Sequence, residues 1–171
     1  TNTKTDLIKR ALSDLMLEYA GAERGVSLAE VGGGYQLRTK SENQLFVRRL
    51  TKGRSFKLSG PSLEVLSIIS YKQPLIKSEV DSIRGVESGH LVRALMDRGL
   101  VRFVGKSELP GKPMLYGTTR KFLEIFGLRD LRELPSLAEI DELIPEGMLD
   151  EEIKEDNWET VQDMSLNYQQ D

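Results

Sequence analysis

Three runs of apolar residues at helical spacing lie between residues 59 and 99, and each run ends at a residue that disfavours a helix. These residues are Pro74, Gly85 and Gly99. Proline lacks the amide hydrogen that a helix interior requires, and glycine readily adopts the left-handed conformation that closes a helix. The apolar positions are Leu63, Leu66, Ile68 and Ile69, then Ile76, Val80 and Ile83, then Val86, Leu91, Leu95 and Met96. The pattern predicts three short helices around one core, the first of them capped by Ser62.

Two strands and a further helix are expected after the third run. Residues 100–104 and 114–118 read as strands, and residues 106–112 form the turn between them. Thr119 is a suitable cap for a helix that carries Phe122, Leu123 and Phe126. Three helices followed by a hairpin are typical of a winged helix, so residues 59–128 are predicted to form a winged-helix domain.

The N-terminal segment repeats part of this pattern. Residues 5–19 show helical spacing, residues 26–31 and 35–39 read as strands, and Gly32, Gly33 and Gly34 supply a tight turn. The glycine run leads into a strand, whereas a phosphate-binding loop leads into a helix. Residues 1–40 are therefore predicted to be the back half of an N-terminal winged-helix domain whose first helices are absent. A self-contained helix–hairpin unit packed on a neighbour is the alternative.

The charge of the chain is divided unevenly. Residues 130–171 hold 14 acidic and 2 basic residues, while residues 1–129 hold 22 basic and 13 acidic residues. Residues 41–58 are expected to form a short helix and a basic connector, and residues 129–171 an acidic, flexible tail. The predicted fold class is α+β, mostly helical, with two winged-helix domains in tandem followed by this tail.

Composition argues against an enzyme and against a metal or cofactor site. The chain has no cysteine and a single histidine, His90, which is expected to lie on the surface at the start of the third helix. Glu79 and Asp81 are two residues apart, so on a helix they point to different sides. No phosphate-binding or dinucleotide-binding fingerprint occurs. With no cysteine, no apolar run long enough to cross a bilayer and no signal-peptide pattern, the sequence favours a soluble cytoplasmic protein.

The winged helix raises the question of whether its ligand is DNA or protein. The third helix is expected at residues 87–98 and contains three basic or polar residues, His90, Arg93 and Arg98, together with the acidic residues Glu87 and Asp97. These are few side chains for hydrogen bonds to base edges in the major groove. Residues 59–121 contain 10 basic and 6 acidic residues, a balance that permits weak phosphate contact without demanding it. A transcription regulator that binds DNA through residues 87–98 therefore remains the alternative to a protein-binding module.

Five motifs in a fixed order resemble the bacterial segregation and condensation protein B (ScpB) family. They are Ser67-Ile68-Ile69-Ser70-Tyr71-Lys72-Gln73-Pro74, Ile83-Arg84-Gly85-Val86, Arg98-Gly99-Leu100-Val101, Pro110-Gly111-Lys112-Pro113-Met114-Leu115-Tyr116-Gly117-Thr118-Thr119 and Phe122-Leu123-Glu124-Ile125-Phe126-Gly127-Leu128. The likeness runs from about residue 19 to about residue 140. Compared with the family, the sequence is expected to lack the front helices of the N-terminal domain, and the acidic tail lies outside the shared region.

The resemblance implies a function as well as a fold. It implies two winged-helix domains, a homodimer formed through the N-terminal domains, no catalytic activity and no cofactor. It further implies that the protein binds the kleisin ScpA, which bridges the heads of an SMC ATPase, and so supports chromosome condensation and segregation at the nucleoid. Contact with DNA is then weak or indirect.

Partner binding is expected in a groove between helix and wing that holds an amphipathic helix. Tyr71 and Tyr116 are the predicted aromatic anchors, and Arg84 and Arg93 the predicted charge-assisted donors. The other interpretation of the two tyrosines is that they complete the domain's own core. Reversing the charges of Arg84 and Arg93 is predicted to weaken kleisin binding and to leave the fold intact. The complete predicted site consists of Tyr71, Lys72, Arg84, Arg93, Lys112 and Tyr116.

Overall fold

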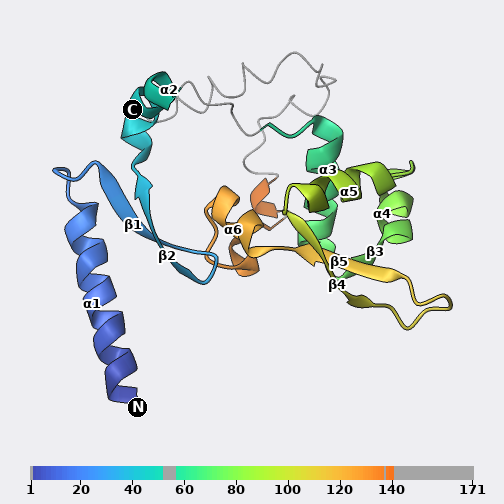
Figure 1. Cartoon of the computed structure of the whole chain (residues 1–171), viewed down its shortest axis with the longest axis horizontal. Helices are drawn as coiled ribbons and strands as arrows, with labels where there is room; N and C mark the ends of the chain where they lie inside the picture. Colours follow the sequence, from blue (N-terminus) through green and yellow to red (C-terminus); the bar gives the residue numbers. More distant parts are fainter. Residues whose placement is uncertain (1, 52–56, 137, 141–171) are drawn as a thin grey trace. The chain divides into compact units, whose positions relative to one another are not determined.

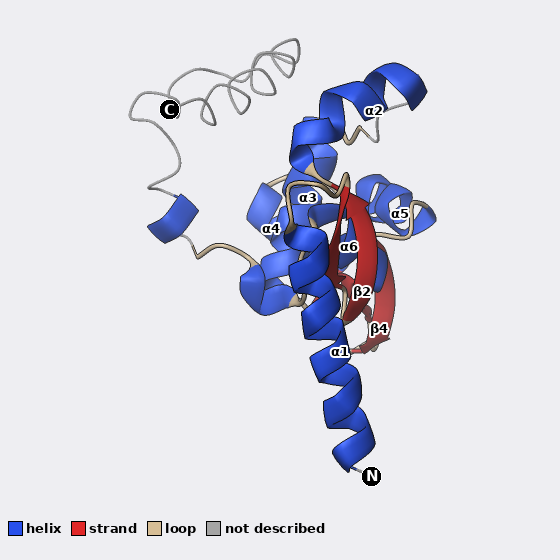
Figure 2. Cartoon of the chain, turned by 90° about the vertical axis from the view of Figure 1, so that its left-hand side faces the viewer, coloured by secondary structure: helices blue, strands red, loops and turns tan. Residues whose placement is uncertain are grey.

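The computed structural model describes residues 2–51, 57–136 and 138–140, and it is drawn in Figure 1. The chain divides into two compact units, residues 1–133 and 134–171. All the helices and strands discussed below lie in the first unit, and Figure 2 shows them by type. Most of the predicted acidic tail lies outside the described residues. Of the predicted basic connector, residues 52–56 also lie outside them.

The first elements are a long helix and a hairpin. Helix α1 spans Asn2–Ala20, and strands β1 (Val26–Val31) and β2 (Gly34–Thr39) pair antiparallel, with Val31 opposite Gly34. A short 3-10 turn, η1 (Ser41–Asn43), leads into helix α2 (Gln44–Thr51). The predicted helix, both strands and the glycine turn are therefore confirmed as local structure. Their assignment to the back half of a winged-helix domain stays a prediction.

The second group of elements has the order of a winged helix. Helix α3 (Gly60–Lys72), strand β3 (Leu75–Ile76), helix α4 (Lys77–Arg84) and helix α5 (Gly89–Asp97) precede strands β4 (Val101–Lys106) and β5 (Met114–Thr118). Strand β5 lies between β3 and β4 in one antiparallel sheet. Helix α6 (Arg120–Phe126) and the 3-10 turn η2 (Leu131–Glu133) follow. The chain thus combines helices with two small sheets.

The core of this group is built from the predicted helices, with corrections to the first. Leu66, Ile69, Val80, Leu95 and Leu100 are at most 2% exposed. Full burial of such side chains stabilises a fold by roughly 1.5–3 kcal/mol each relative to exposure. The buried face of α3 also uses Val65, which the predicted face omitted, while Leu63 and Ile68 are only half-buried.

Three helix starts test the sequence-based capping argument. Helix α3 begins at Gly60, so the N-cap position is held by Ser59 and not by the predicted Ser62, and Pro61 suits the first helical turn. The Ser59 side chain makes no capping hydrogen bond to the backbone. Ser62 is buried, and its hydroxyl shares a hydrogen bond of 2.9 Å with that of Ser59. Helix α5 begins at Gly89, two residues later than expected. For α6 the prediction is confirmed, since the Thr119 hydroxyl accepts a hydrogen bond from the Phe122 amide at 3.2 Å.

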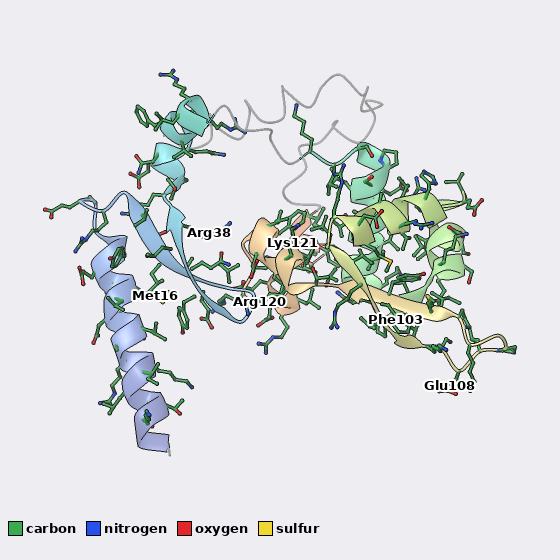
Figure 3. All side chains as sticks on the ribbon, in the orientation of Figure 1. Met16, Arg38, Phe103, Glu108, Arg120 and Lys121 are labelled. Atoms are coloured by element: carbon green, nitrogen blue, oxygen red, sulfur yellow. The ribbon has the colours of Figure 1, made fainter. Side chains whose placement is uncertain are left out.

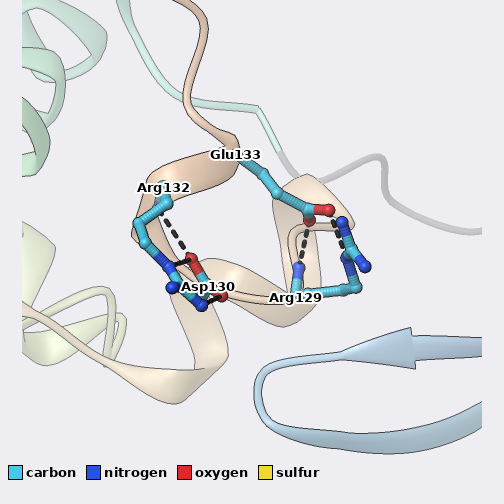
Figure 4. A network of polar contacts seen from close by, with 4 residues as sticks. All are labelled: Arg129, Asp130, Arg132 and Glu133. Carbon is cyan, nitrogen blue, oxygen red and sulfur yellow. Dashed lines mark hydrogen bonds and ion pairs between the residues drawn. The ribbon is translucent and has the colours of Figure 1, made fainter.

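Two ion pairs organise the segment that follows α6 (Figure 4). The Arg129 guanidinium pairs with Glu133, and the Arg129 amide also donates to the Glu133 carboxylate at 2.6 Å. The Arg132 guanidinium pairs with Asp130 at 2.7 Å, and the Arg132 amide donates to the same carboxylate at 2.8 Å. Both acids therefore receive a charged donor and a backbone donor within one turn.

These bonds predict how the segment responds to acid. The Arg132 side chain lowers the pKa of Asp130 from 3.8 to about 2, and the Arg129 amide lowers the pKa of Glu133. A lowered pKa stabilises the folded segment above the ordinary carboxyl pKa, and this stabilisation is lost as the pH falls towards the folded value. We expect carboxyl ¹³C NMR to give a midpoint for Asp130 near 2. A midpoint at 3.8 would show that the Arg132 contacts do not persist in solution.

Candidate partner-binding site

A depression of about 460 Å³ lies where α3 ends and α4 begins, and we call it the α3–α4 depression. It is large enough to receive one or two side chains of a partner and is open to solvent. Its floor and one wall are apolar, and its rim carries one basic and one acidic residue. The lining residues are Lys72, Pro74, Leu75, Glu79, Ser82 and Ile83.

The local sequence explains how these residues meet. Helix α3 ends at Lys72 ahead of Pro74, which cannot continue a helix, and the chain then runs as β3 along the central strand β5. Leu75 is held opposite Tyr116 by this pairing and is only 3% exposed, so it forms the floor. Ile83 lies one helical turn after Glu79 on α4 and is 48% exposed, which leaves its side chain accessible at the wall.

The edge of the α3–α4 depression carries one acidic residue, Glu79, and one basic residue, Lys72. The Glu79 carboxylate accepts the Ile76 amide at 2.7 Å, so it satisfies a free donor at the start of α4. Lys72 is the last residue of α3 and is exposed. An apolar floor with a lysine on its rim suits an amphipathic peptide that places an apolar residue in the depression and an acid near the ammonium group.

Of the six predicted site residues, the structure brings Lys72 into the depression and Tyr116 beside its floor. Tyr116 is half-buried and lies opposite both Leu75 and Phe103 in the sheet. Tyr71 is 44% exposed on the last turn of α3, next to Lys72. Neither tyrosine is fully buried, so both retain surface that a partner can contact.

Arg84 stabilises the fold, whereas the sequence predicts that it is an accessible hydrogen-bond donor to a partner. Its side chain is only 8% exposed, and its guanidinium binds Glu64 of α3 at 2.9 Å and the Ser88 hydroxyl at 2.9 Å. Ser88 is fully buried, and its amide donates to Asp81 at 2.7 Å. Arg84 therefore joins α3 to the turn between α4 and α5. We therefore expect charge reversal at Arg84 to weaken the fold, contrary to the sequence-based prediction, because the reversed charge would face Glu64 inside this network.

Arg93 and Lys112 are exposed but do not line the depression. Arg93 projects from α5, and Lys112 lies at the tip of the wing with a positive φ of 43°. Their roles in partner binding stay predictions. The structure thus gathers only part of the predicted site at one place.

Five lining residues were missed by the sequence-based selection of site residues: Pro74, Leu75, Glu79, Ser82 and Ile83. Ile83 had been assigned to the buried face of its helix together with Ile76 and Val80, both of which are buried. The short length of α4 is the sequence feature that could have distinguished the exposed Ile83 from the buried Ile76 and Val80. In a helix of eight residues that ends at Arg84, Ile83 lies on the last turn and is 48% exposed, whereas Val80 in the middle of the helix is fully buried.

The helix that would read DNA has few side chains available for bases. Glu87 precedes α5 and pairs with Lys77 at 2.8 Å, an interaction that raises the pKa of Lys77. Arg98 donates to the Lys57 carbonyl at 2.8 Å. His90 and Arg93 are exposed, and the surface position expected for His90 is confirmed. Two such residues make a smaller reading set than major-groove recognition ordinarily uses.

Metal and membrane features were sought in the described part of the chain. Residues 2–51, 57–136 and 138–140 contain no group of three or more acidic or histidine side chains arranged to hold a metal ion. Over the same ranges, no helix combines the length and apolar character needed to span a bilayer.

Comparisons with known proteins point to one family. The family model described as "Segregation and condensation complex subunit ScpB" matches residues 1–137. "Segregation and condensation protein B" of Syntrophotalea carbinolica is 51% identical over 135 residues, which cover 79% of this chain and 68% of the relative. The Myxococcus xanthus protein of the same name is 43% identical over 146 residues, covering 85% of this chain and 44% of the relative.

A solved structure is also among the proteins that resemble this chain. The crystal structure of ScpB from Mycobacterium tuberculosis is 30% identical to this chain, with a TM-score of 0.42 and coverage of 71% of this chain and 76% of that one. The family model covers most of the residues that the structure describes, including every element of the candidate site. The chain therefore belongs to the segregation and condensation protein B (ScpB) family, whose members are subunits of a segregation and condensation complex.

Proposed function

We propose that this chain is a non-enzymatic subunit that binds the kleisin ScpA and, through it, the SMC ATPase. In this role it supports chromosome condensation and segregation at the nucleoid in the cytoplasm, without a cofactor of its own. Family membership supports the assignment to chromosome segregation, and the α3–α4 depression carries the proposal of a protein ligand.

The contact that we propose is an amphipathic helix of ScpA laid across the α3–α4 depression. One apolar side chain of the kleisin enters between Pro74 and Ile83 and rests on Leu75. An acidic side chain of the kleisin pairs with Lys72, and Tyr71 supplies a partly exposed aromatic edge beside it. Apolar burial in a small pocket flanked by aromatic and charged groups is where binding energy concentrates in protein interfaces.

We further propose that the N-terminal elements belong to a second winged-helix domain through which two chains associate as a homodimer. Large apolar side chains remain exposed on α1, β2 and α2, and contiguous exposed apolar surface is typical of an association face. The most exposed of them are Leu7, Ile8, Leu17, Leu37, Leu45, Phe46 and Leu50.

The depression gives a direct test of the kleisin contact. Replacing Ile83 with Asp places a charge on the apolar wall, so we expect the affinity for ScpA to fall about tenfold or more, which corresponds to about 1.4 kcal/mol. Isothermal titration of the full chain with ScpA measures this effect. The matched control is Ile125→Asp, because Ile125 is another partly exposed isoleucine, at 37%, on α6 outside the depression.

The outcome separates the proposed function from its alternative. Equal affinities for the Ile83→Asp and Ile125→Asp variants would place the kleisin contact elsewhere. If the chain binds no ScpA and instead shifts a specific DNA sequence at nanomolar concentration with strong salt dependence, the transcription-regulator alternative holds.

A further inference from the structure

The glycine run at residues 32–34 is longer than its turn requires. Gly32 and Gly33 have positive φ values of 58° and 71°, as a tight two-residue hairpin turn demands. Gly34 is already the first residue of β2, where it pairs with Val31, and its φ is not in the left-handed region. A side chain at position 34 would be compatible with the turn, so the third glycine needs another explanation.

The turn lies against the end of α6, as Figure 1 shows for the tip of the β1–β2 hairpin. The Gly32 amide donates to the Leu128 carbonyl at 2.9 Å, and the Gly33 amide donates to the Arg129 carbonyl at 3.1 Å. These two carbonyls follow the C-terminus of α6, where backbone acceptors lack partners within the helix. Two consecutive amides of the hairpin thus bind carbonyls of the turn that directly follows α6, far away in the sequence.

Side chains close the same contact. Arg38 of β2 donates through Nη2 to the Glu124 carbonyl of α6 at 3.2 Å. Arg120 of α6 pairs with Glu124 at 3.0 Å and covers the turn, and Figure 3 labels both arginines. Val31, at the base of the turn, is 1% exposed, whereas the rest of β1 is half-buried.

The room available for a side chain differs among the three glycines of the turn. A Cβ atom at position 34 would lie 2.7 Å from Nη2 of Arg120, and one at position 32 would lie 3.1 Å from its Cγ. At position 33 a Cβ would meet nothing within 4 Å. Gly32 therefore permits close approach to α6, since a Cβ there would also lie 3.4 Å from the Arg120 carbonyl oxygen. At position 34 the near atom is the end of the exposed Arg120 side chain, which a larger residue would have to displace from the turn, and Gly33 serves only the turn.

We propose that the glycine turn is a latch, which we define as residues 32–34 together with Arg38, Arg120 and the carbonyls of residues 124, 128 and 129. The latch holds the helix–hairpin segment (residues 2–39) on the winged-helix group (residues 60–126) as one body. The two groups are joined in sequence by residues 40–59, and the latch adds a direct contact between them. A partner that contacts both groups then meets a preorganised surface and loses less entropy on binding.

The absence of cysteine allows a measurement without background labels. Spin labels are placed on Glu23→Cys and Lys106→Cys, at exposed positions in the two groups, and pulsed electron resonance records their separation in the full chain. Mixing the labelled protein with an excess of unlabelled chain removes from the signal any distance between spin labels on two different molecules. We expect a single narrow distance peak for the otherwise unaltered protein. We expect Gly34→Arg to abolish that peak, because it sets a second guanidinium against Arg120.

Matched variants decide the outcome. Gly33→Asn is the control and keeps the narrow peak, because Asn tolerates a positive φ and its Cβ meets no neighbour. A second label pair, Glu23→Cys with Thr39→Cys, reports whether the helix–hairpin segment itself stays folded. If Gly34→Arg disturbs that pair, Arg38→Ala provides the test, since it removes only the donor to Glu124, and loss of the peak is again expected. A broad distribution in the unaltered protein, or a narrow one in both latch variants, overturns the proposal. None of these readings depends on ScpA.

Discussion

Replacing Arg84 with Glu is expected to lower the free energy of unfolding of the winged-helix group by about 3 kcal/mol. The substitution removes the guanidinium that binds Glu64 and Ser88 and sets a second carboxylate against Glu64. Arg84 is 8% exposed, so the new charge is largely shielded from water, while Glu64 is 52% exposed and can partly move away. For this reason the expected cost lies at the lower end of the range for breaking a buried ion pair.

Urea denaturation followed by circular dichroism measures this loss as a lower midpoint at an unchanged slope. Arg93→Glu is the matched control, since Arg93 is exposed on α5 and surface substitutions usually change stability by no more than about 0.5 kcal/mol. Equal midpoints for the two variants would show that the Arg84 network contributes little. The experiment also bears on partner binding, because a loss of ScpA affinity in Arg84→Glu would report unfolding and not a lost contact.

Replacing Gln73 with Ala is expected to cost about 2 kcal/mol of unfolding free energy. The Gln73 side chain links the end of α3 to the central strand of the sheet. Its Oε1 accepts the Thr118 amide at 2.7 Å, and its Nε2 donates to the Ser70 carbonyl at 3.1 Å. Thr118 is 8% exposed, so its amide would lose its partner in a place that water reaches poorly.

The Gln73→Ala prediction is checked by thermal unfolding beside Gln44→Ala, which truncates an exposed glutamine at the start of α2. We expect the melting temperature to fall only for Gln73→Ala. In addition, hydrogen exchange at the Thr118 amide should accelerate, which identifies the lost bond directly. If Thr118 stays protected while stability is unchanged, another acceptor takes the place of Gln73.

Local structure followed closely from local sequence. The glycines at 85, 99 and 127 adopt positive φ and end helices or turns, and Thr119 caps α6 as its type and position predict. The hairpin at 26–39 was expected from alternation on either side of a glycine turn, and its two strands pair antiparallel in the structure. These features succeed because the responsible interactions span only a few residues, so the residue types alone decide them.

The candidate site was predicted less completely for a physical reason. Tyr71 and Lys72 could be chosen from their place at the end of a helix, and Lys72 does line the depression. The accessibility of Ile83 and the loss of accessibility of Arg84 depend on which helices cover them. Arg84 finds its partner Glu64 twenty residues away, a pairing that no spacing rule indicates.

The sequence by itself determined the order and bounds of most helices and strands, the absence of cysteine chemistry, and the resemblance to the ScpB family. Only the tertiary structure decided that Arg84 is part of the fold, that Pro74, Leu75 and Ile83 form a depression, and that the glycine run contacts α6. Periodicity and capping are properties of neighbouring residues, and the sequence displays them directly. Burial and approach between distant segments arise from packing the whole chain, so they become visible only when the segments are placed in space.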